Sequence, residues 1–379
     1  MFLSEAIKRE ARALGFDAVG VCRVDADCSK SEVPGSTSAP PSARPLSDSG
    51  TSNVEHRTSL PGLLYRRLLD WLERGYHGSM AWMEKAPFRR ADPREVLPGC
   101  RSIISVGMNY YTDHRPDESP GHGRIARYAW GKDYHKVLGE RLTRLEARIK
   151  ALAPEARTRA YVDTGPVMEK AWAQQAGLGW IGKHSNLVSA DYGSWLLLGE
   201  VLTTLELDPD EPAADLCGSC SLCIKACPTG AITEPYVVDA RKCISYLTIE
   251  LRGPADTIPT ELASKLGNRI FGCDDCLDIC PYNMNAQPTG EPAFQPSPLT
   301  LAPVLAHLAA QREPEFAATF RHSPIRRARH SGFLRNVGIA LRNSTQPLAS
   351  SKQLRSDAPT ASLSSHLKIL PSGGSLSHL

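Results

Sequence analysis

The hydrophobic and polar positions of residues 1–210 follow the periods of helices and strands in turn. Helices are predicted at the start of the chain and over residues 60–83, 137–152 and 164–177. Strands are predicted between them, over residues 16–24, 101–111, 158–163 and 193–207. The second of these strands alternates between apolar and polar positions. The order of elements favours a mixed α/β (α+β) domain.

The last two predicted helices have the clearest signals. The helix over 137–152 carries one apolar stripe, made of Leu138, Leu142, Leu145, Ile149 and Leu152. The helix over 164–177 has start signals in Thr164 and Pro166, and Gly177 is suited to end it.

Two stretches lack the apolar residues that a core needs. Residues 28–59 contain no Ile, Phe, Met, Trp or Tyr, and in residues 344–379 ten of the thirty-six residues are Ser. Because such segments bury too little apolar surface to offset the entropy of ordering, we expect a disordered insertion at 28–59 and a disordered tail at 344–379.

Composition indicates the cellular compartment of the protein and the role of its cysteines. The 379 residues carry a formal charge of +3, which neither requires nor excludes a polyanionic partner. The N-terminus lacks the apolar run of a signal peptide, and no segment reaches transmembrane length, so we expect a cytoplasmic protein with no membrane contact. Thiols stay reduced there, so the eleven cysteines indicate metal ligands rather than disulfides.

The first cysteine run consists of Cys217, Cys220, Cys223 and Cys227, with Pro228 behind the last. This is the spacing of bacterial ferredoxins, in which three thiolates hold one [4Fe-4S] cluster and the fourth reaches the neighbouring cluster. A tetrahedral zinc site usually takes two separated pairs of ligands instead. The run therefore predicts a ferredoxin-type domain with two clusters.

The second run is one ligand short, because Ile270 stands where a further cysteine would complete it. Cys243 lies between the runs and is the candidate for the missing thiolate; a buried thiol without a metal role is the alternative. We expect one cluster on Cys217, Cys220, Cys223 and Cys280, and the other on Cys227, Cys243, Cys273 and Cys276.

Several long blocks of the sequence resemble epoxyqueuosine reductases. They read "RIARYAWGKDYHKVLG", "YVDTGPVMEKAWAQQAGLGWIGKHSNL", "CPTGAI", "DARKCISYLTIE" and "GNRIFGCDDCLDICPYN". The resemblance covers about residues 1–26 and 60–342 and is more specific than the ferredoxin run alone. It implies an enzyme that removes the epoxide oxygen of epoxyqueuosine at the wobble position of a tRNA anticodon, giving queuosine.

The resemblance also implies cofactors and partners. Cobalamin, bound base-off, is expected beside the two [4Fe-4S] clusters. The substrate is expected to be a tRNA with a GUN-type anticodon, specific for aspartate, asparagine, histidine or tyrosine. Since no Rossmann or Walker pattern occurs in the chain, the electron donor is expected to be an external flavodoxin or ferredoxin. The enzyme is expected to be a monomer.

The expected domains follow from the blocks and the composition. Residues 1–27 and 60–210 form a cobalamin-binding reductase domain, 211–290 a ferredoxin-type two-cluster domain, and 291–343 a short helical tRNA-binding region. Members of the family usually continue into a C-terminal helical-repeat domain, whereas here the pattern ends near Ser344.

Asp163, in "YVDTGP", matches the position of the family's proposed proton donor. An alkoxide is a poor leaving group, so a proton donor is needed as the carbon–oxygen bond opens, and burial would keep this carboxyl protonated. The alternative is that Asp163 only caps the helix beginning near Pro166. Weaker candidates for contacts to cobalamin or substrate, each also explicable as an ordinary polar residue, are Arg90, Asn109, Tyr134, Lys183, Ser245 and Asp274.

Two further features concern ligands. The segment "DYHKVLG" resembles a cobalamin histidine loop, but its glycine is one residue too far from the histidine. His135 is therefore expected to be structural or substrate-facing and not bound to cobalt.

Six arginines and no acid lie in residues 321–342. They would neutralise tRNA phosphates or simply form a solvated helix face: Arg321, Arg326, Arg327, Arg329, Arg335 and Arg342.

Two other functions stay open on sequence grounds. A corrinoid reductive dehalogenase pairs a similar cofactor domain with two clusters, although the cytoplasmic start and the shared blocks argue against it. A non-catalytic ferredoxin-type electron carrier would have no use for corrin, so cobalamin co-purification distinguishes it.

Overall fold

The computed structural model describes residues 2–24, 59–284 and 286–344. The disorder expected at 28–59 and 344–379 falls outside these residues, apart from Ser59 and Ser344. The helices are α1 (Phe2–Ala13), α3 (Leu60–Glu73), α4 (Pro87–Ala91), α5 (Tyr134–Leu152), α6 (Glu169–Gln175), α7 (Leu222–Ala226), α8 (Ile244–Ile249), α9 (Thr260–Lys265), α10 (Asp275–Asp278), α11 (Pro298–Leu301), α12 (Leu305–Ala309), α13 (Glu313–Thr319) and α14 (Arg329–Ser344). The strands are β1 (Ala18–Arg23), β2 (Ser102–Asn109), β3 (Arg124–Ile125), β4 (Thr158–Tyr161), β5 (Trp180–Ile181), β6 (Leu187–Val188), β7 (Leu196–Thr203), β8 (Ile232–Glu234), β9 (Val237–Val238) and β10 (Arg269–Phe271).

The central sheet has the strand order β1-β2-β7-β4, and every neighbouring pair is antiparallel. Its register places Ser105 of β2 between Gly20 of β1 and Glu200 of β7. Although helices and strands alternate along the chain, the sheet is not parallel. The region therefore takes the α+β form of the predicted mixed class.

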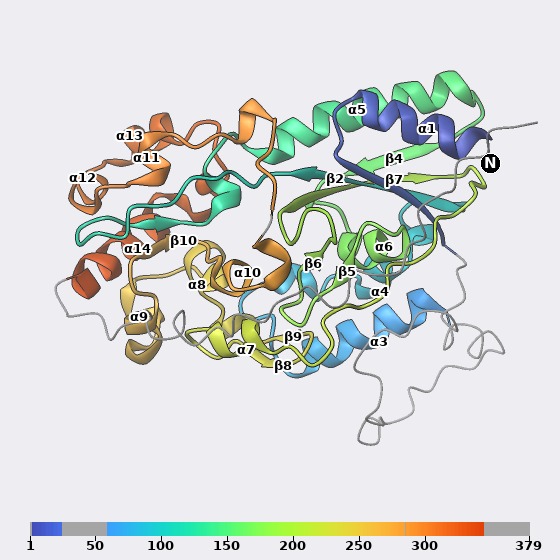
Figure 1. Ribbon diagram of the computed structural model, residues 1–379. Coiled ribbons are helices and arrows are strands. Elements are labelled where there is room, and N and C mark those ends of the chain that lie inside the picture. Colours follow the sequence, from blue (N-terminus) through green and yellow to red (C-terminus); the bar gives the residue numbers. More distant parts are fainter. Residues whose placement is uncertain (1, 25–58, 285, 345–379) are drawn as a thin grey trace, which may run out of the picture. The chain divides into compact units, whose positions relative to one another are not determined.

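Helices cover both faces of this sheet. In Figure 1, α1 and α5 lie over one face and α6 lies against the other. The strand predicted over 101–111 is confirmed as β2, and all eight of its residues are buried because both faces of the sheet are covered. On α5 the predicted stripe is confirmed at Leu138, Leu142, Leu145 and Ile149, whereas Leu152, the last residue of the helix, is exposed.

The helix predicted over 164–177 is shorter than expected. α6 begins at Glu169 and ends before Gly177, whose φ of +79° is the left-handed conformation that suits glycine. Residues 162–168, called the Asp163 loop below, form no helix. At its far end α6 approaches β1 so closely that a Cβ at Gly20 would lie 1.9 Å from the carbonyl oxygen of Ala176.

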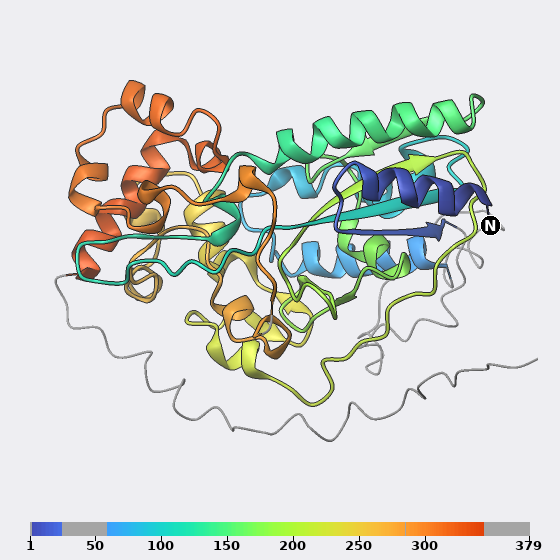
Figure 2. The same ribbon diagram turned by 45° about the horizontal axis from the view of Figure 1, so that its top comes forward.

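The C-terminal helices share their core with earlier parts of the chain. Phe333 and Val337 of α14 lie in one apolar cluster with Ile125, Trp130 and Phe271, next to the parallel pair β3–β10. Figure 2 shows the orange and red helices of this region beside the teal segment that leads into β3. None of the helices in the described ranges is long and apolar enough to cross a membrane.

Candidate active site

Asp163 lies in an exposed turn just after β4. Its side chain is 65% exposed, and its backbone has a φ of +57°. A residue other than glycine in the left-handed region costs on the order of 1 kcal/mol or more, and such residues gather at functional sites. The Asp163 loop therefore presents its carboxyl group to whatever binds there.

The start of α5 holds this carboxyl group in place. The Tyr134 hydroxyl donates a hydrogen bond of 2.7 Å to Asp163 Oδ2, and His135 Nε2 lies 3.6 Å from the same oxygen. The other ring nitrogen of His135, Nδ1, is 2.8 Å from Asp133 Oδ1. The rings of Tyr134 and His135 stack with their centroids 4.1 Å apart. A histidine thus lies between two carboxylates, one of which faces solvent.

Electrostatics place a proton on His135 rather than on Asp163. Contact with the His135 imidazole lowers the pKa of Asp163; burial opposes this effect and the hydrogen bond from Tyr134 adds to it. Burial alone would lower the pKa of His135, but its bonds to Asp133 and Asp163 outweigh burial and raise that pKa to about 9. At neutral pH, Asp163 is therefore a carboxylate paired with an imidazolium.

Two expectations about these residues change. The alternative that Asp163 caps the following helix is wrong, because α6 starts after Met168 and has no side-chain cap. The expectation that burial keeps Asp163 protonated is also reversed, since its neighbours favour the charged form. Sequence reasoning missed the role of His135, although an Asp-x-His spacing at the first turn of a helix was a usable signal.

The pairing of His135 has a measurable consequence for stability. A histidine whose pKa is about 9 when folded and about 6.5 when unfolded stabilises the protein fully below pH ~6.5, and this stabilisation is lost as pH rises through ~9. We expect His135→Gln to lower the thermal midpoint at pH 6 and to match the wild type above about pH 9. The exposed His307 on α12 is the control, and an equal effect of His307→Gln, or a pH-independent difference, would contradict the pairing.

A second charged group lies on the α6 side of the Asp163 loop. Glu169, the first residue of α6, has a carboxyl oxygen that is buried without a hydrogen-bond partner among the described residues. Arg90 of α4 likewise has a buried Nε without a partner there, while its guanidinium lies 5.0 Å from the centre of the Trp82 ring. Burial lowers the pKa of Arg90, and the Glu169 carboxylate opposes this effect. The unpartnered Oε1 of Glu169 and Nε of Arg90 could hydrogen-bond to a polar ligand.

Four predicted contact residues already have partners in the protein. Asn109 donates to the Gln287 carbonyl and accepts from the Tyr111 N–H, so its amide is satisfied. Lys183 Nζ donates to the carbonyls of Gly218 and Cys220, which shapes the first cysteine loop.

The other two lie beside cysteines of the second predicted set. Ser245 lies near Cys243 and offers its N–H and hydroxyl to that sulfur, which moderates the rise in pKa caused by burial of the thiol. Asp274 is buried and accepts the backbone N–H of Arg127 at 2.6 Å.

The cysteine side chains separate into the two predicted sets. The pKa of the Cys223 thiol rises to about 11, first through burial and then through the charges of Cys217, Cys280 and Cys220. Around Cys276, the corresponding neighbours are Cys273, Cys243 and Cys227. Cys223 and Cys276 therefore each lie near the other three members of their predicted sets.

Within the described ranges, no group of three or more His, Cys, Asp or Glu side chains is gathered as a site for a single metal ion.

The six arginines of residues 321–342 do not form one surface. Arg335 is buried, and its guanidinium donates to the carbonyls of Leu247 in α8 and of Leu251 just after α8. Arg327 forms an ion pair with Glu250. The phosphate-binding role expected of Arg335 is therefore wrong, because its donors already serve the backbone. The exposed members are Arg321, Arg326, Arg327, Arg329 and Arg342.

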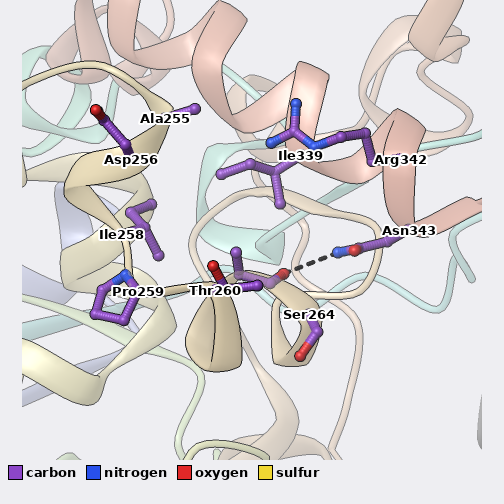
Figure 3. Close-up of a pocket in the computed structure, with 10 residues that line it drawn as sticks. Ala255, Asp256, Ile258, Pro259, Thr260, Ser264, Ile339, Arg342 and Asn343 are labelled. Atoms are coloured by element: carbon purple, nitrogen blue, oxygen red, sulfur yellow. Dashed lines mark hydrogen bonds between the residues drawn. The ribbon is translucent and has the colours of Figure 1, made fainter.

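A pocket near the end of α14 contains no cysteine and no residue of the Asp163 loop (Figure 3). It lies between α9 and α14, and Asn343 donates to the Ala263 carbonyl across it at 2.9 Å. Its lining is mostly small and aliphatic, with Asp256 and Arg342 as its charged residues. It lacks the acid–base groups found around Asp163.

Comparison with known proteins agrees with this geometry. Residues 90–164 match the family model "Epoxyqueuosine reductase QueG, DUF1730", and residues 216–283 match "4Fe-4S double cluster binding domain". An epoxyqueuosine reductase of Synechocystis is 48% identical over 273 residues, which are 72% of this chain and 93% of that protein. The Escherichia coli K12 enzyme is 41% identical over 345 residues, covering 90% and 81% respectively.

Solved structures give the same result. A crystal structure of epoxyqueuosine reductase with an epoxyqueuosine-modified stem loop of tRNA-Tyr aligns with a TM-score of 0.76 and 30% identity, covering 90% of this chain and 82% of that one. A Bacillus subtilis epoxyqueuosine reductase with its catalytic loop swung out of the active site aligns with a TM-score of 0.75 and 29% identity over 90% and 82%. The chain belongs to the epoxyqueuosine reductase family.

Proposed function

We propose that this enzyme reduces epoxyqueuosine to queuosine at position 34 of the anticodon of a GUN-type tRNA, using cobalamin and two [4Fe-4S] clusters. The observation that carries the proposal is Asp163, held by Tyr134 and His135 on an open loop in the same folded unit as two sets of four cysteines. The modified tRNA stem loop bound by a structurally similar relative supports the substrate class.

The proposed ligands of the clusters are the two cysteine sets given above. Cobalamin carries peripheral amide groups, and the unpartnered polar atoms of Arg90 and Glu169 beside the Asp163 loop suit such groups. When bound, these cofactors would supply the two electrons of the reduction, which the clusters would store one at a time.

The residues of the chain supply the protons. Converting an epoxide to an alkene and water consumes two electrons and two protons, so an acid must serve the departing oxygen. Asp163 delivers the proton at its carboxyl group, and His135 replenishes it through the contact at Oδ2. Tyr134 keeps that oxygen oriented through its hydrogen bond of 2.7 Å. We also propose that the Asp163 loop moves between an inward and an outward position, as in the Bacillus subtilis relative.

Exposed arginines before and at the start of α14 are proposed to hold tRNA phosphates. Replacing Arg321, Arg326 and Arg329 together with Gln should weaken tRNA binding and lower the slope of log K against log salt by about two to three. The matched control replaces Arg9, Arg12 and Arg144, which are exposed on α1 and α5. Salt titration of binding, monitored by fluorescence anisotropy, measures both slopes. Equal slopes for the two triple variants would contradict this surface.

The deciding experiment is anaerobic reconstitution with iron, sulfide and cobalamin, followed by reduction in the presence of tRNA containing epoxyqueuosine. Mass analysis of nucleosides should show queuosine. A protein that takes up iron but never binds cobalamin would instead be an electron carrier. Unchanged epoxyqueuosine beside an active relative would overturn the proposed reaction for this chain.

A further inference from the structure

One side chain from outside the cysteine segment donates directly to a sulfur of the first cysteine set. Trp180 of β5 is only 2% exposed, and its indole Nε1–H donates a hydrogen bond of 3.4 Å to Cys217 Sγ, 37 positions later in the chain. In the other set, the sulfur of Cys227 accepts a backbone N–H, that of Ala231, at 3.2 Å. The donor to Cys217 is therefore a side chain, which can be replaced without changing the sequence of the cysteine loop.

The indole of Trp180 is held in this orientation by its surroundings. The ring of Tyr282, two residues after Cys280, packs nearly at right angles to it, with the ring centroids 4.8 Å apart. Lys183, three residues after Trp180, donates to the carbonyls of Gly218 and Cys220. The segment that carries Trp180 therefore also anchors the cysteine loop that its N–H faces.

The sulfur of Cys217 is a better acceptor as a thiolate on iron than as a thiol. A thiolate has no proton to donate and carries more negative charge, so the indole N–H makes a charge-assisted hydrogen bond to it. Reduction of a cluster adds one more negative charge to the iron, sulfide and thiolates. An N–H aimed at one of these sulfurs therefore stabilises the reduced form more than the oxidised form, and the reduction potential rises.

We propose that Trp180 raises the reduction potential of the cluster on Cys217, Cys220, Cys223 and Cys280, called the first cluster below. This inference rests on the proposed ligand set, which lies within the match to a double-cluster binding domain over residues 216–283. On reduction, the oxidised first cluster takes one electron from a one-electron donor, the indole keeps its proton, and no bond forms or breaks. The hydrogen bond allows a weaker reductant to fill this cluster.

Redox titration of the anaerobically reconstituted protein, monitored by electron paramagnetic resonance, tests the proposal without tRNA. Trp180→Phe keeps a buried aromatic ring but has no N–H. The equilibrium constant for reduction of the first cluster should fall about tenfold, a shift of ~59 mV to more negative potential for a one-electron couple, and the midpoint of the other cluster should stay. The matched control is Trp172→Phe, because Trp172 is 0% exposed and its Nε1 has no hydrogen-bond partner among the described residues. Both midpoints should stay in that variant.

An isosteric replacement separates the hydrogen bond from packing. Benzothienylalanine in place of Trp180 keeps the shape of the indole but carries sulfur where the N–H was. The midpoint of the first cluster should shift as in Trp180→Phe. Midpoints equal to those of the wild type in both replacements would overturn the proposal.

The wild type provides a second readout that needs no variant and stands even if Trp180→Phe fails to fold. With isotopically labelled indole nitrogens, pulsed electron paramagnetic resonance should detect coupling between the reduced first cluster and one indole. Absence of this coupling would overturn the proposal, and so would a reconstituted protein without the first cluster. A chain that shows the coupling and the shift but never reduces epoxyqueuosine would refute the proposed reaction and not the role of Trp180.

Discussion

Asp163→Asn is expected to leave both clusters and the bound cobalamin unchanged and to reduce turnover about 10²- to 10⁴-fold. The asparagine oxygen still accepts the Tyr134 hydroxyl, but the amide cannot donate an acidic proton, and His135 loses one of its two anionic partners. Asparagine also tolerates the left-handed φ of +57° better than most residues, so the loop should keep its conformation.

The measurement is the rate of queuosine formation under anaerobic conditions, alongside visible spectra of the clusters and of cobalamin. Asp191→Asn is the matched control, because this aspartate is exposed in a loop on the same domain and lies outside the site. Turnover near the wild-type rate in Asp163→Asn, with intact spectra, would remove Asp163 from the reaction. Loss of cobalamin would instead indicate that the carboxylate binds the cofactor.

Local chemistry explains which features were predictable from the sequence. The geometry of a cubane cluster dictates short spacings between thiolates, so the spacing of Cys217, Cys220 and Cys223 predicts that they share one cluster. The stripe on α5 was predictable because one helix face must meet the sheet at Leu138 and Leu142. Each of these features depends on residues close together in the chain.

Features created by tertiary packing could not be predicted in the same way. Thr164 and Pro166 are good helix starters, yet Gly165 packs against the Tyr161 ring, where a Cβ would lie 2.3 Å from the ring, and the segment forms a loop instead. Arg335 belongs to a basic run, but the carbonyls around the end of α8 need donors, and the arginine is buried to supply them.

The site around Asp163 depends on a local sequence motif and also on tertiary packing. The motif "YVDTGP" identified Asp163, but the neighbours that set its charge come from α5 and α6. His135 lies 28 residues earlier in the chain, so no local pattern joins it to Asp163. Residue identity therefore located the site, and only the fold brings His135 to Asp163, where the imidazole lowers the pKa of the carboxyl group.

Cys243→Ser should remove one cluster and abolish turnover. This thiol lies between Lys242 and α8, where Cys227 and Cys276 are its electrostatic neighbours. Ser245 provides an N–H and a hydroxyl at the sulfur. Serine keeps the shape but is a poor substitute for a thiolate on iron. Iron should fall from about eight to about four per chain.

Stability should fall as well, because the second cluster joins segments that are distant in sequence, so its binding energy contributes to folding. Cys243 packs at the edge of the apolar cluster of Ile244, Leu247 and Ile339, which links α8 to α14, and we expect a lower thermal midpoint there. Cys100→Ser is the control, because Cys100 is a buried thiol whose sulfur donates to the Ser102 carbonyl and belongs to neither cysteine set. Iron analysis and electron paramagnetic resonance of the reduced proteins distinguish the two variants. If Cys243→Ser retained all its iron and both cluster signals, Cys243 would be an ordinary buried thiol and the second cluster would need another ligand.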